Sequence, residues 1–300
     1  MTETPPDIPG IKILGKCGVG GMSTVWKAID LEGGGRTIAV KVLNREYSDR
    51  RSDIKLFLEE ERAMERIDHP GIVKSYGSTI SNGIWYSKME YVDGYNFAAL
   101  LGRKLHLIEA DCLLIRESVA AALDYAWNDH GIVHCDIKPE NIMINSDGVV
   151  KLTDLGICRT FSLSGEDEAE VPEHILGTPA YISPEQVYGD MELDCRSDIY
   201  SLAASIYHLA TGRMLFPGLD NDQTLRAHCD ETTQAKDPRA YRPELSEGFC
   251  QMLEAMLVKN RDDRVNSWTD VISMCLAVEK GGKFKPRSTT GASSIALDRI

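Results

Sequence analysis

A short polar stretch near the middle of the chain constrains its fold and its chemistry more than any other feature. Residues 134–141 read His-Cys-Asp-Ile-Lys-Pro-Glu-Asn, and an Asp-Leu-Gly turn begins thirteen residues after Asn141. The first turn supplies a carboxylate at Asp136 and a cation at Lys138. The side chains of Asn141 and Asp154 add oxygen atoms, the ligands that Mg²⁺ prefers. The spacing therefore predicts a catalytic loop followed by a metal-binding loop.

This combination suits transfer of a phosphoryl group from ATP. The γ-phosphoryl group carries spread negative charge, so its transfer depends mainly on positioning and on nearby cations. We interpret Asp136 as the group that accepts the proton of a substrate hydroxyl, and Lys138 as a cation that screens the moving phosphate. Asn141 and Asp154 would hold Mg²⁺. His134 is interpreted as packed support for the loop rather than as a base.

The two turns resemble the catalytic and metal-binding loops of eukaryotic-like protein kinases, and the bacterial Hanks-type Ser/Thr kinases are the most similar branch. The resemblance covers roughly residues 11 to 280. It implies an α+β, bilobal fold that binds ATP between its lobes. A strand-rich N-lobe with one helix is expected over residues 11–93, and a helical C-lobe over residues 94–280. Residues 1–10 would form an N-terminal extension, and residues 281–300 a disordered tail.

A glycine-rich segment near the N-terminus, residues 15–25, is the first landmark of this resemblance. Glycine lacks a Cβ, so its backbone can lie close to phosphates. The resemblance makes Gly18 and Gly20 the first two glycines of a turn that covers the phosphates. A surface hairpin would look similar, whereas a dinucleotide-binding fold needs a helix where residues 24–26 favour a strand. The residues expected to contact the nucleotide here are Gly18, Val19, Gly20, Gly21, Met22, Ser23 and Val25.

A lysine lies inside the apolar run Ile-Ala-Val-Lys-Val at residues 38–42. Burying Lys41 costs free energy unless it is paired, although a solvent-facing strand position would need no partner. Residues 53–67 show helical periodicity, with Glu60 on the apolar stripe and Glu61 at its border. The resemblance implies that Lys41 contacts the α- and β-phosphates and pairs with a helical glutamate, and the family spacing favours Glu60.

The adenine-binding segment is expected at the end of a strand over residues 85–92. In the family, the backbone at the place of Glu90 to Val92 meets the adenine. Met89 would stand at the gatekeeper position or serve as a core methionine, and both can hold at once. The residues that complete the expected nucleotide site are Ala39, Glu90, Val92 and Met143.

Features further along the chain favour a protein substrate. Residues 154–185 resemble an activation segment ending in Ser-Pro-Glu, with Thr178 placed as in Ser/Thr-specific kinases. Glu185 is expected to be buried and paired with Arg264, because loss of one partner from such a pair strands a charge. Asp198 is expected to brace the backbone of the catalytic loop. Phosphotransferases that act on small molecules share the nucleotide core but generally lack these features.

The chain departs from the family pattern at three positions. Cys135 replaces an arginine that, where present, binds a phosphate on the activation segment. We therefore expect activity to depend little on phosphorylation of Ser162 or Ser164. Leu155 replaces a phenylalanine and still fills an apolar slot. Ser75 stands where an apolar residue is usual and would loosen the packing behind the predicted helix.

Eight cysteines are scattered along the chain without a Cys-x-x-Cys pair, which argues against a zinc site. This usage is typical of a reducing compartment. Cys17, Cys135 and Cys158 fall near the predicted nucleotide site. The favoured interpretation is that all three are ordinary small residues. The alternative is that activity is sensitive to thiol reagents.

Composition narrows the partners and the location. The net charge of −13 argues against general affinity for nucleic acids and favours basic protein substrates. The N-terminal residues lack the apolar core of a signal peptide, and no apolar run is long enough to span a membrane. We therefore expect a cytoplasmic protein. Ser288, Thr289 and Thr290 in the predicted tail follow basic residues and are candidate sites of autophosphorylation.

The sequence thus predicts an active Ser/Thr protein kinase that uses ATP and Mg²⁺ to phosphorylate protein substrates and itself, in bacterial signalling. No expected catalytic residue is missing from the chain. Two alternatives stay open. A catalytically weak scaffold is supported by Ser75 and Cys135, and a small-molecule phosphotransferase would share the nucleotide core. The sequence assigns no particular substrate, activating signal or oligomeric state.

Overall fold

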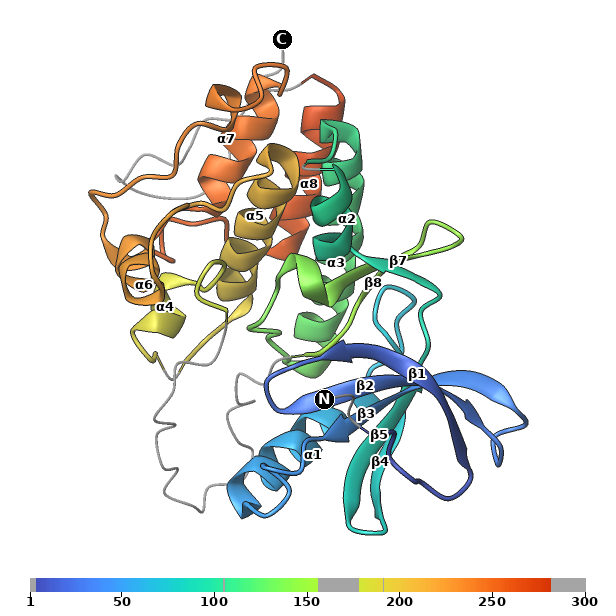
Figure 1. The fold of residues 1–300 in the computed structure, drawn as a ribbon. Helices are drawn as coiled ribbons and strands as arrows, with labels where there is room; N and C mark the ends of the chain where they lie inside the picture. Colours follow the sequence, from blue (N-terminus) through green and yellow to red (C-terminus); the bar gives the residue numbers. More distant parts are fainter. Residues whose placement is uncertain (1–3, 105, 156–177, 191, 282–300) are drawn as a thin grey trace. The chain divides into compact units, whose positions relative to one another are not determined.

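The structure, a computed structural model, describes residues 4–104, 106–155, 178–190 and 192–281 (Figure 1). Contacts between residues divide the chain into two compact units, Met1–Gly94 and Tyr95–Ile300. The alternation of apolar and polar residues explains the first unit, and longer apolar stripes at helical spacing explain most of the second.

The N-terminal unit is built on a five-stranded antiparallel sheet. Its strands are β1 (Ile11–Val19), β2 (Ser23–Asp30), β3 (Arg36–Leu43), β4 (Ser75–Ser81) and β5 (Ile84–Glu90). Their order in the sheet is β1-β2-β3-β5-β4. Along β2 every second residue is buried, as expected of a strand with one face on a core. Ile8, from the predicted N-terminal extension, is buried in this core with Trp26 and Ile38.

One helix, α1 (Arg51–Glu65), contacts β4 in the same unit. It buries Phe57 and Met64, which lie seven residues apart and so on one face of the helix. The helix begins two residues before the predicted range of 53–67 and ends two residues before its end. Its C-terminus tightens because the N–H of Ile67 donates to the carbonyl of Met64, three residues back rather than four.

The C-terminal unit is mainly helical. Its longer helices are α2 (Phe97–Lys104), α3 (Glu109–His130), α5 (Cys195–Thr211), α6 (Asn221–Cys229), α7 (Glu247–Met256) and α8 (Trp268–Glu279). Helices α3, α5, α7 and α8 pack together, with α5 in contact with each of the other three (Figure 1). Helix α5 is almost entirely buried, which explains its continuous run of apolar and small residues.

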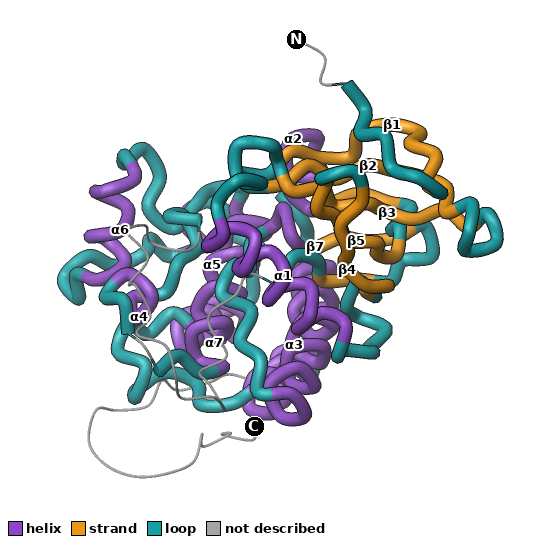
Figure 2. The backbone as a smooth tube through the Cα atoms, turned by 90° about the horizontal axis from the view of Figure 1, so that it is seen from below, coloured by secondary structure: helices purple, strands orange, loops and turns teal. Residues whose placement is uncertain are grey.

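Short elements complete this unit and carry the loops of interest. They are β6 (Gly94–Asn96), η1 (Pro139–Asn141), β7 (Ile142–Asn145), β8 (Val150–Leu152), α4 (Pro184–Val187) and η2 (Pro238–Ala240). A small sheet has the order β6-β7-β8. Figure 2 shows strands gathered around β1–β5 and helices dominating the rest. The predicted α+β fold, a strand-rich lobe with one helix and then a helical lobe, is confirmed.

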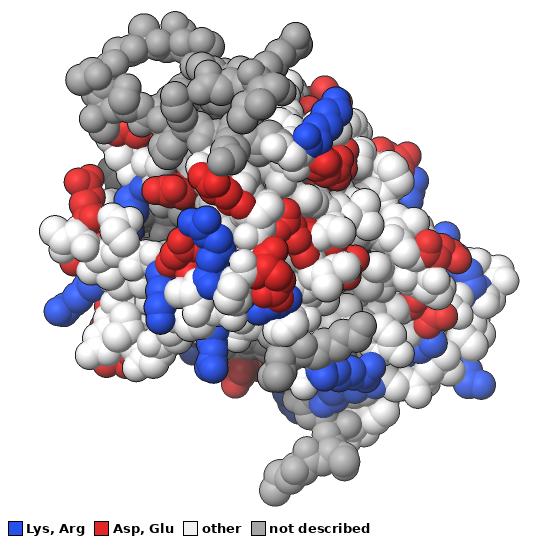
Figure 3. Space-filling view, turned by 90° about the horizontal axis from the view of Figure 1, so that it is seen from above, with Lys and Arg blue, Asp and Glu red and all other residues white. Residues whose placement is uncertain are grey.

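The described part of the chain contains no helix that is long and apolar enough to cross a membrane. On the face drawn in Figure 3, acidic and basic side chains are interspersed rather than gathered by sign. The excess of 13 negative charges is therefore not visible as one acidic patch on that face.

Candidate active site

The predicted catalytic loop follows the longest helix of the C-terminal unit. Helix α3 ends at Gly131, which adopts φ 64°, a left-handed conformation that glycine enters at little cost. The loop then runs to η1, whose first residue is Pro139. Within the loop, the carbonyl of Ile137 accepts a hydrogen bond from the hydroxyl of Ser205 on α5 at 3.2 Å. The loop backbone is thus held by a buried helix rather than left to its own conformational preferences.

Asp136 lies at the centre of a cluster of polar side chains. Lys138 Nζ lies 2.6 Å from Asp136 Oδ2, and Asn141 Nδ2 donates to the same oxygen at 3.1 Å. Thr178 Oγ1 donates to Asp136 Oδ1 at 3.0 Å. Lys138 Nζ also lies 2.8 Å from Thr178 Oγ1. The cluster joins a carboxylate, an ammonium group and a hydroxyl, and it brings together Asp136, Lys138 and Asn141 from the predicted site.

Asn141 and Asp154 offer a donor set that fits Mg²⁺. Since the oxygens of Asp136 only accept hydrogen bonds, the amide nitrogen of Asn141 must face Asp136 and its Oδ1 is turned elsewhere. The backbone N–H of Thr153 donates a hydrogen bond to the carbonyl of Asn141 at 3.0 Å. This bond holds the residue before Asp154 beside Asn141. One amide and one carboxylate, completed by phosphate oxygens and waters, is a usual protein contribution to a Mg²⁺ site.

The backbone of Asp154 is itself unusual. It adopts φ 51°, in the left-handed region where residues other than glycine are uncommon. Such conformations persist where the surroundings hold them and often occur at functional sites. The next residue, Leu155, is 3% exposed and fills an apolar slot, as predicted.

His134 and Asp198 hold the loop through hydrogen bonds to its backbone. Asp198 accepts the backbone N–H groups of His134 and Cys135, each at 2.7 Å, which confirms the predicted brace. Burial raises the pKa of Asp198 to about 7, although these two hydrogen bonds oppose the rise. The His134 ring accepts the Asp136 N–H at Nδ1 and faces the Thr153 carbonyl with Nε2, so Nε2 carries the proton. Burial lowers the pKa of His134, and the ring acts as neutral support.

Cys135 differs from the favoured interpretation of an ordinary small residue. It is disulfide-bonded in the structure. The other described cysteines are free thiols: Cys17, Cys112, Cys195, Cys229, Cys250 and Cys275. The carbonyl of Cys135 accepts a hydrogen bond from Gln186 Nε2 on α4 at 2.8 Å. Neither interaction is predictable from local sequence patterns, because neither a disulfide partner nor a long-range side-chain contact leaves a local pattern.

In the N-terminal unit, Lys41 lies near two carboxylates. The residue is 7% exposed and sits on β3 opposite Val25 of β2. Its Nζ is 3.1 Å from Glu60 Oε2 and 3.6 Å from Glu61 Oε1. Glu61 is the more deeply buried of the two glutamates, with a side chain 2% exposed against 22% for Glu60. The pairing of Lys41 with Glu60 is present, and Glu61 joins it as a partner outside the predicted site.

The glycine-rich turn connects β1 and β2. Gly20 N–H donates to the Ser23 carbonyl at 2.8 Å, which closes the turn. A Cβ added to Gly18 or Gly21 would meet no atom within 4 Å, and neither residue has a positive φ. The turn itself therefore does not require glycine at these two positions. Close approach of another molecule to the backbone would explain them, which is the role predicted from the sequence.

The strand expected to meet the adenine is β5 and the residues that follow it. Ala39 of β3 lies opposite Met89 of β5, and both are buried, as is Val92. The N–H of Glu90 donates to the carbonyl of Lys74 at 2.8 Å. In the other unit, Met143 is half-buried on β7.

Ser75 lies opposite Met89, at the start of β4. Its hydroxyl accepts the N–H of Gly77 at 3.2 Å. The polar side chain thus has a local partner in the strand where an apolar residue was expected.

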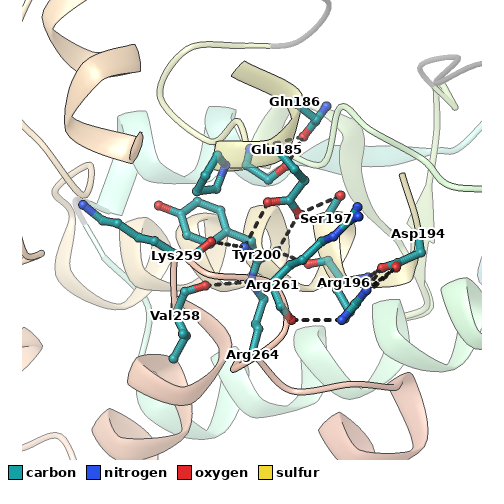
Figure 4. A network of polar contacts seen from close by, with 12 residues as sticks. Glu185, Gln186, Asp194, Arg196, Ser197, Tyr200, Val258, Lys259, Arg261 and Arg264 are labelled. Carbon is teal, nitrogen blue, oxygen red and sulfur yellow. Dashed lines mark hydrogen bonds and ion pairs between the residues drawn. The ribbon is translucent and has the colours of Figure 1, made fainter. Parts of the chain in front are cut away.

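A buried ion pair anchors the end of the predicted activation segment (Figure 4). Arg264 donates to both oxygens of Glu185, at 2.7 and 3.0 Å, which confirms the predicted pair. Arg264 also donates to the carbonyls of Arg196, Val258 and Lys259. Burial alone would raise the pKa of Glu185. The hydrogen bonds and charge of Arg264, helped by the Ser197 hydroxyl, outweigh burial and hold that pKa below its ordinary value.

Several predictions fall on residues that the structure does not describe. Ser162, Ser164 and Cys158 lie outside the described residues, as do Ser288, Thr289 and Thr290. Among the described residues, Thr178 is the main functional candidate missing from the predicted site. The sequence marks Thr178 as a residue typical of Ser/Thr-specific kinases, but it does not predict the contact between Thr178 and Asp136.

Comparison with known proteins assigns the family. The model of the protein kinase domain family matches residues 11–276. A probable serine/threonine-protein kinase of Streptomyces coelicolor is 35% identical over 282 residues, which cover 91% of this chain and 41% of that protein. PknA of Mycobacterium tuberculosis is 34% identical over 273 residues, which cover 89% of this chain and 61% of that protein.

Solved structures agree. The crystal structure of the Mycobacterium tuberculosis PknI kinase domain matches with a TM-score of 0.68 and 25% identity, over 90% of this chain and 97% of that one. The chain therefore belongs to the protein kinase family, and its resemblance to bacterial Hanks-type Ser/Thr kinases is confirmed. It spans 41% and 61% of the length of the two curated relatives named above.

Proposed function

We propose that this chain is a Ser/Thr protein kinase that transfers the γ-phosphate of ATP to hydroxyl groups of protein substrates. The observation that carries the proposal is the cluster of Asp136, Lys138 and Thr178. Its carboxylate lies within 3.0 Å of a hydroxyl and 2.6 Å of an ammonium group. A substrate serine that took the place of the Thr178 hydroxyl would meet a proton acceptor and a cation together.

Each residue has a role in this mechanism. Asp136 orients the acceptor hydroxyl and takes its proton as the new P–O bond forms and the bond between the γ-phosphorus and the leaving ADP oxygen breaks. Lys138 offsets charge on the transferred group. Asn141 and Asp154 would hold Mg²⁺, which when bound neutralises charge on the phosphate oxygens. Lys41, kept in place by Glu60, would bind the α- and β-phosphates.

The remaining predicted residues would position the nucleotide. The turn from Gly18 to Ser23 would cover the phosphates, and the low steric demand at Gly18 and Gly21 supports this role. Ala39, Val92 and Met143 would pack on the adenine. The protein kinase relatives support a protein substrate rather than a small molecule.

The test is incorporation of labelled phosphate from ATP and Mg²⁺ into the chain and into a basic test protein. Wild type is compared with Asp136→Asn and with Asp129→Asn, a control that removes an equal charge from the exposed surface of α3. We expect label on serine or threonine in wild type and the control, and at least a 100-fold lower rate in Asp136→Asn. ATP binding without transfer in wild type would favour a scaffold. Hydrolysis without labelled protein would favour a small-molecule substrate.

A further inference from the structure

The buried helix α5 carries three polar side chains that bind neighbouring loops. Asp198 accepts two backbone N–H groups of the catalytic loop, and Ser205 donates to the carbonyl of Ile137 in the same loop. His208 lies three residues after Ser205, so the two side chains are neighbours on the helix surface. The ring of His208 is hydrogen-bonded to the hydroxyl of Tyr181 at 2.8 Å. One helix therefore holds both the catalytic loop and the segment around Tyr181.

The contact between Tyr181 and His208 has a defined donor and acceptor. The two rings stack with their centroids 6.0 Å apart and an interplanar angle of 22°. Tyr181 is 4% exposed, and burial raises its pKa, so the phenol keeps its proton. Among the described residues its hydroxyl has no other hydrogen-bond partner, so we assign the phenol as donor and Nδ1 of His208 as acceptor. This bond requires an unprotonated Nδ1.

A short turn connects Tyr181 to the catalytic cluster. The N–H of Tyr181 donates to the carbonyl of Thr178 at 3.0 Å. The hydroxyl of Thr178 in turn donates to Asp136 Oδ1 at 3.0 Å. Rotation of the Thr178 side chain alone can free this carboxylate oxygen for another hydroxyl, while the backbone of the turn stays beside it. The position of that backbone depends on Tyr181, and through Tyr181 on His208.

We propose that His208 is a positioning residue for the transfer step, and that its unprotonated ring holds the turn from Thr178 to Tyr181 beside Asp136. This inference rests on the proposed kinase function. An acceptor serine that displaces the Thr178 hydroxyl lies against the backbone of this turn. A loose turn lowers the fraction of complexes in which the acceptor is aligned. It therefore lowers the rate of transfer and leaves the binding of ATP unchanged.

Protonation of His208 removes this hold. Burial lowers the pKa of His208 below the ordinary value of 6.5, and among the described residues burial is its one cause. The charged side chain that acts on Tyr181 is Glu140 of η1. A protonated ring can only donate, which leaves the buried phenol proton without an acceptor. The bond is thus present above the folded-state pKa of His208 and is lost as the pH falls through it.

The first test compares His208→Asn with His208→Leu in the full chain. The two side chains are similar in size, and only asparagine can accept the hydroxyl of Tyr181. At pH 8, kcat for a serine peptide should stay within about twofold of wild type in His208→Asn and fall about tenfold in His208→Leu. KM for ATP should change little in either variant. Equal kcat in the two variants, or a rise in KM for ATP as large as the loss of kcat, would overturn the proposal.

Two tyrosine variants separate positioning from loss of stability. Tyr181→Phe removes the donor of the proposed contact and should lower kcat as His208→Leu does. Tyr207→Phe is its matched control, because Tyr207 is a buried residue of α5 whose hydroxyl donates to the carbonyl of Lys236, also at 2.8 Å. The control loses a similar hydrogen bond away from the turn and should keep the kcat of wild type. Equal losses of kcat in both variants would mean that stability alone is responsible, which contradicts the proposal.

A pH series tests the role of the proton. Asparagine does not titrate, so kcat of His208→Asn divided by kcat of wild type should rise as the pH falls below 6.5. Asp198 titrates in both proteins, and its effect cancels in this ratio. A constant ratio down to about pH 5 would overturn the release by acid. Wild type without any phosphate transfer would overturn the proposed function together with this inference. Transfer by wild type with equal kcat in every variant would overturn the inference alone.

Discussion

At the scale of single residues, two carboxylates beside Lys41 offset the free-energy cost of burying this cation. Lys41 Nζ lies 3.1 Å from Glu60 and 3.6 Å from Glu61, so either glutamate alone can supply a countercharge. Glu60 is the more exposed partner, which suits a group that must adjust when phosphates bind. Glu61 is nearly fully buried and suits a structural role.

We therefore predict strong coupling between Glu60→Gln and Glu61→Gln. Each single variant should lose less than about 1 kcal/mol of the free energy of unfolding, because one carboxylate stays beside the lysine. The double variant removes both and should lose about 3 kcal/mol. Urea unfolding of the four proteins gives the coupling energy. Losses that add within about 0.5 kcal/mol would show that the two glutamates act independently.

Asp198 gives a second prediction at this scale, one that depends on pH. Its pKa is raised to about 7 by burial, above the ordinary value of 3.8. The folded chain therefore binds more protons than the unfolded chain between these values. The contribution of this group to stability is fully present below about pH 4 and is lost as the pH rises through about 7.

Replacing Asp198 by asparagine removes the titrating carboxyl group. It also points an amide N–H₂, which can only donate, at one of the two backbone N–H groups that Asp198 accepts in wild type. At pH 8, Asp198→Asn should lose about 1–3 kcal/mol of unfolding free energy, because one buried N–H loses its acceptor. Its stability should also change less than that of wild type between pH 5 and pH 8. Urea unfolding at both values measures the two effects. An equal pH dependence in the two proteins would show that Asp198 does not titrate in this range.

At the scale of elements, α4 is held to α5 and to the segment before α8 by the pair of Glu185 and Arg264. The pKa of Glu185 is held below its ordinary value of 4.5, so its contribution to stability is present above pH 4.5. That contribution is lost as the pH falls through the lower, folded-state value. Arg264 also donates hydrogen bonds to three backbone carbonyls, which ties the ion pair to the surrounding chain.

We expect Arg264→Met to be more damaging than Glu185→Gln. The arginine variant leaves a buried carboxylate without its cation and should lose about 3–5 kcal/mol at pH 7. The glutamine variant keeps a hydrogen-bonding side chain toward Ser197 and should lose less. Below pH 4.5 the difference between wild type and Glu185→Gln should shrink, because the unfolded chain binds a proton at Glu185 at a higher pH than the folded chain does. Thermal unfolding at pH 7 and pH 4 checks the order, and a difference that grows in acid would contradict the assignment.

The elements also show what sequence patterns could and could not predict. The pair of Glu185 and Arg264 and the brace at Asp198 were predictable, because each stands at a family spacing from a recognisable motif. Periodicity placed α1 within two residues at either end, but it put Glu60 on the apolar stripe and Glu61 at its border, whereas Glu61 is the buried residue of the two. It could not choose between two adjacent carboxylates, since an apolar stripe is broader than one residue. The contact of Gln186 with Cys135 joins residues 51 positions apart, and local patterns carry no such information.

At the scale of the whole molecule, the net charge of −13 should act on substrates before they dock. A cationic peptide approaches an anionic protein faster than an anionic peptide does, and salt weakens this effect. The face drawn in Figure 3 mixes both signs, so we attribute the attraction to the summed charge rather than to one patch on that face.

The corresponding prediction compares two peptides with the same acceptor serine, one flanked by arginines and one by glutamates. At an ionic strength of about 0.1 M, where the Debye length is about 10 Å, kcat/KM should favour the basic peptide by at least about tenfold. Near an ionic strength of 1 M the Debye length falls to about 3 Å. Most of the preference for the basic peptide should then disappear, because its KM rises while its kcat stays nearly constant. A preference that survives high salt would mean that individual carboxylates contact the peptide directly, because short-range pairs are screened much less than long-range attraction.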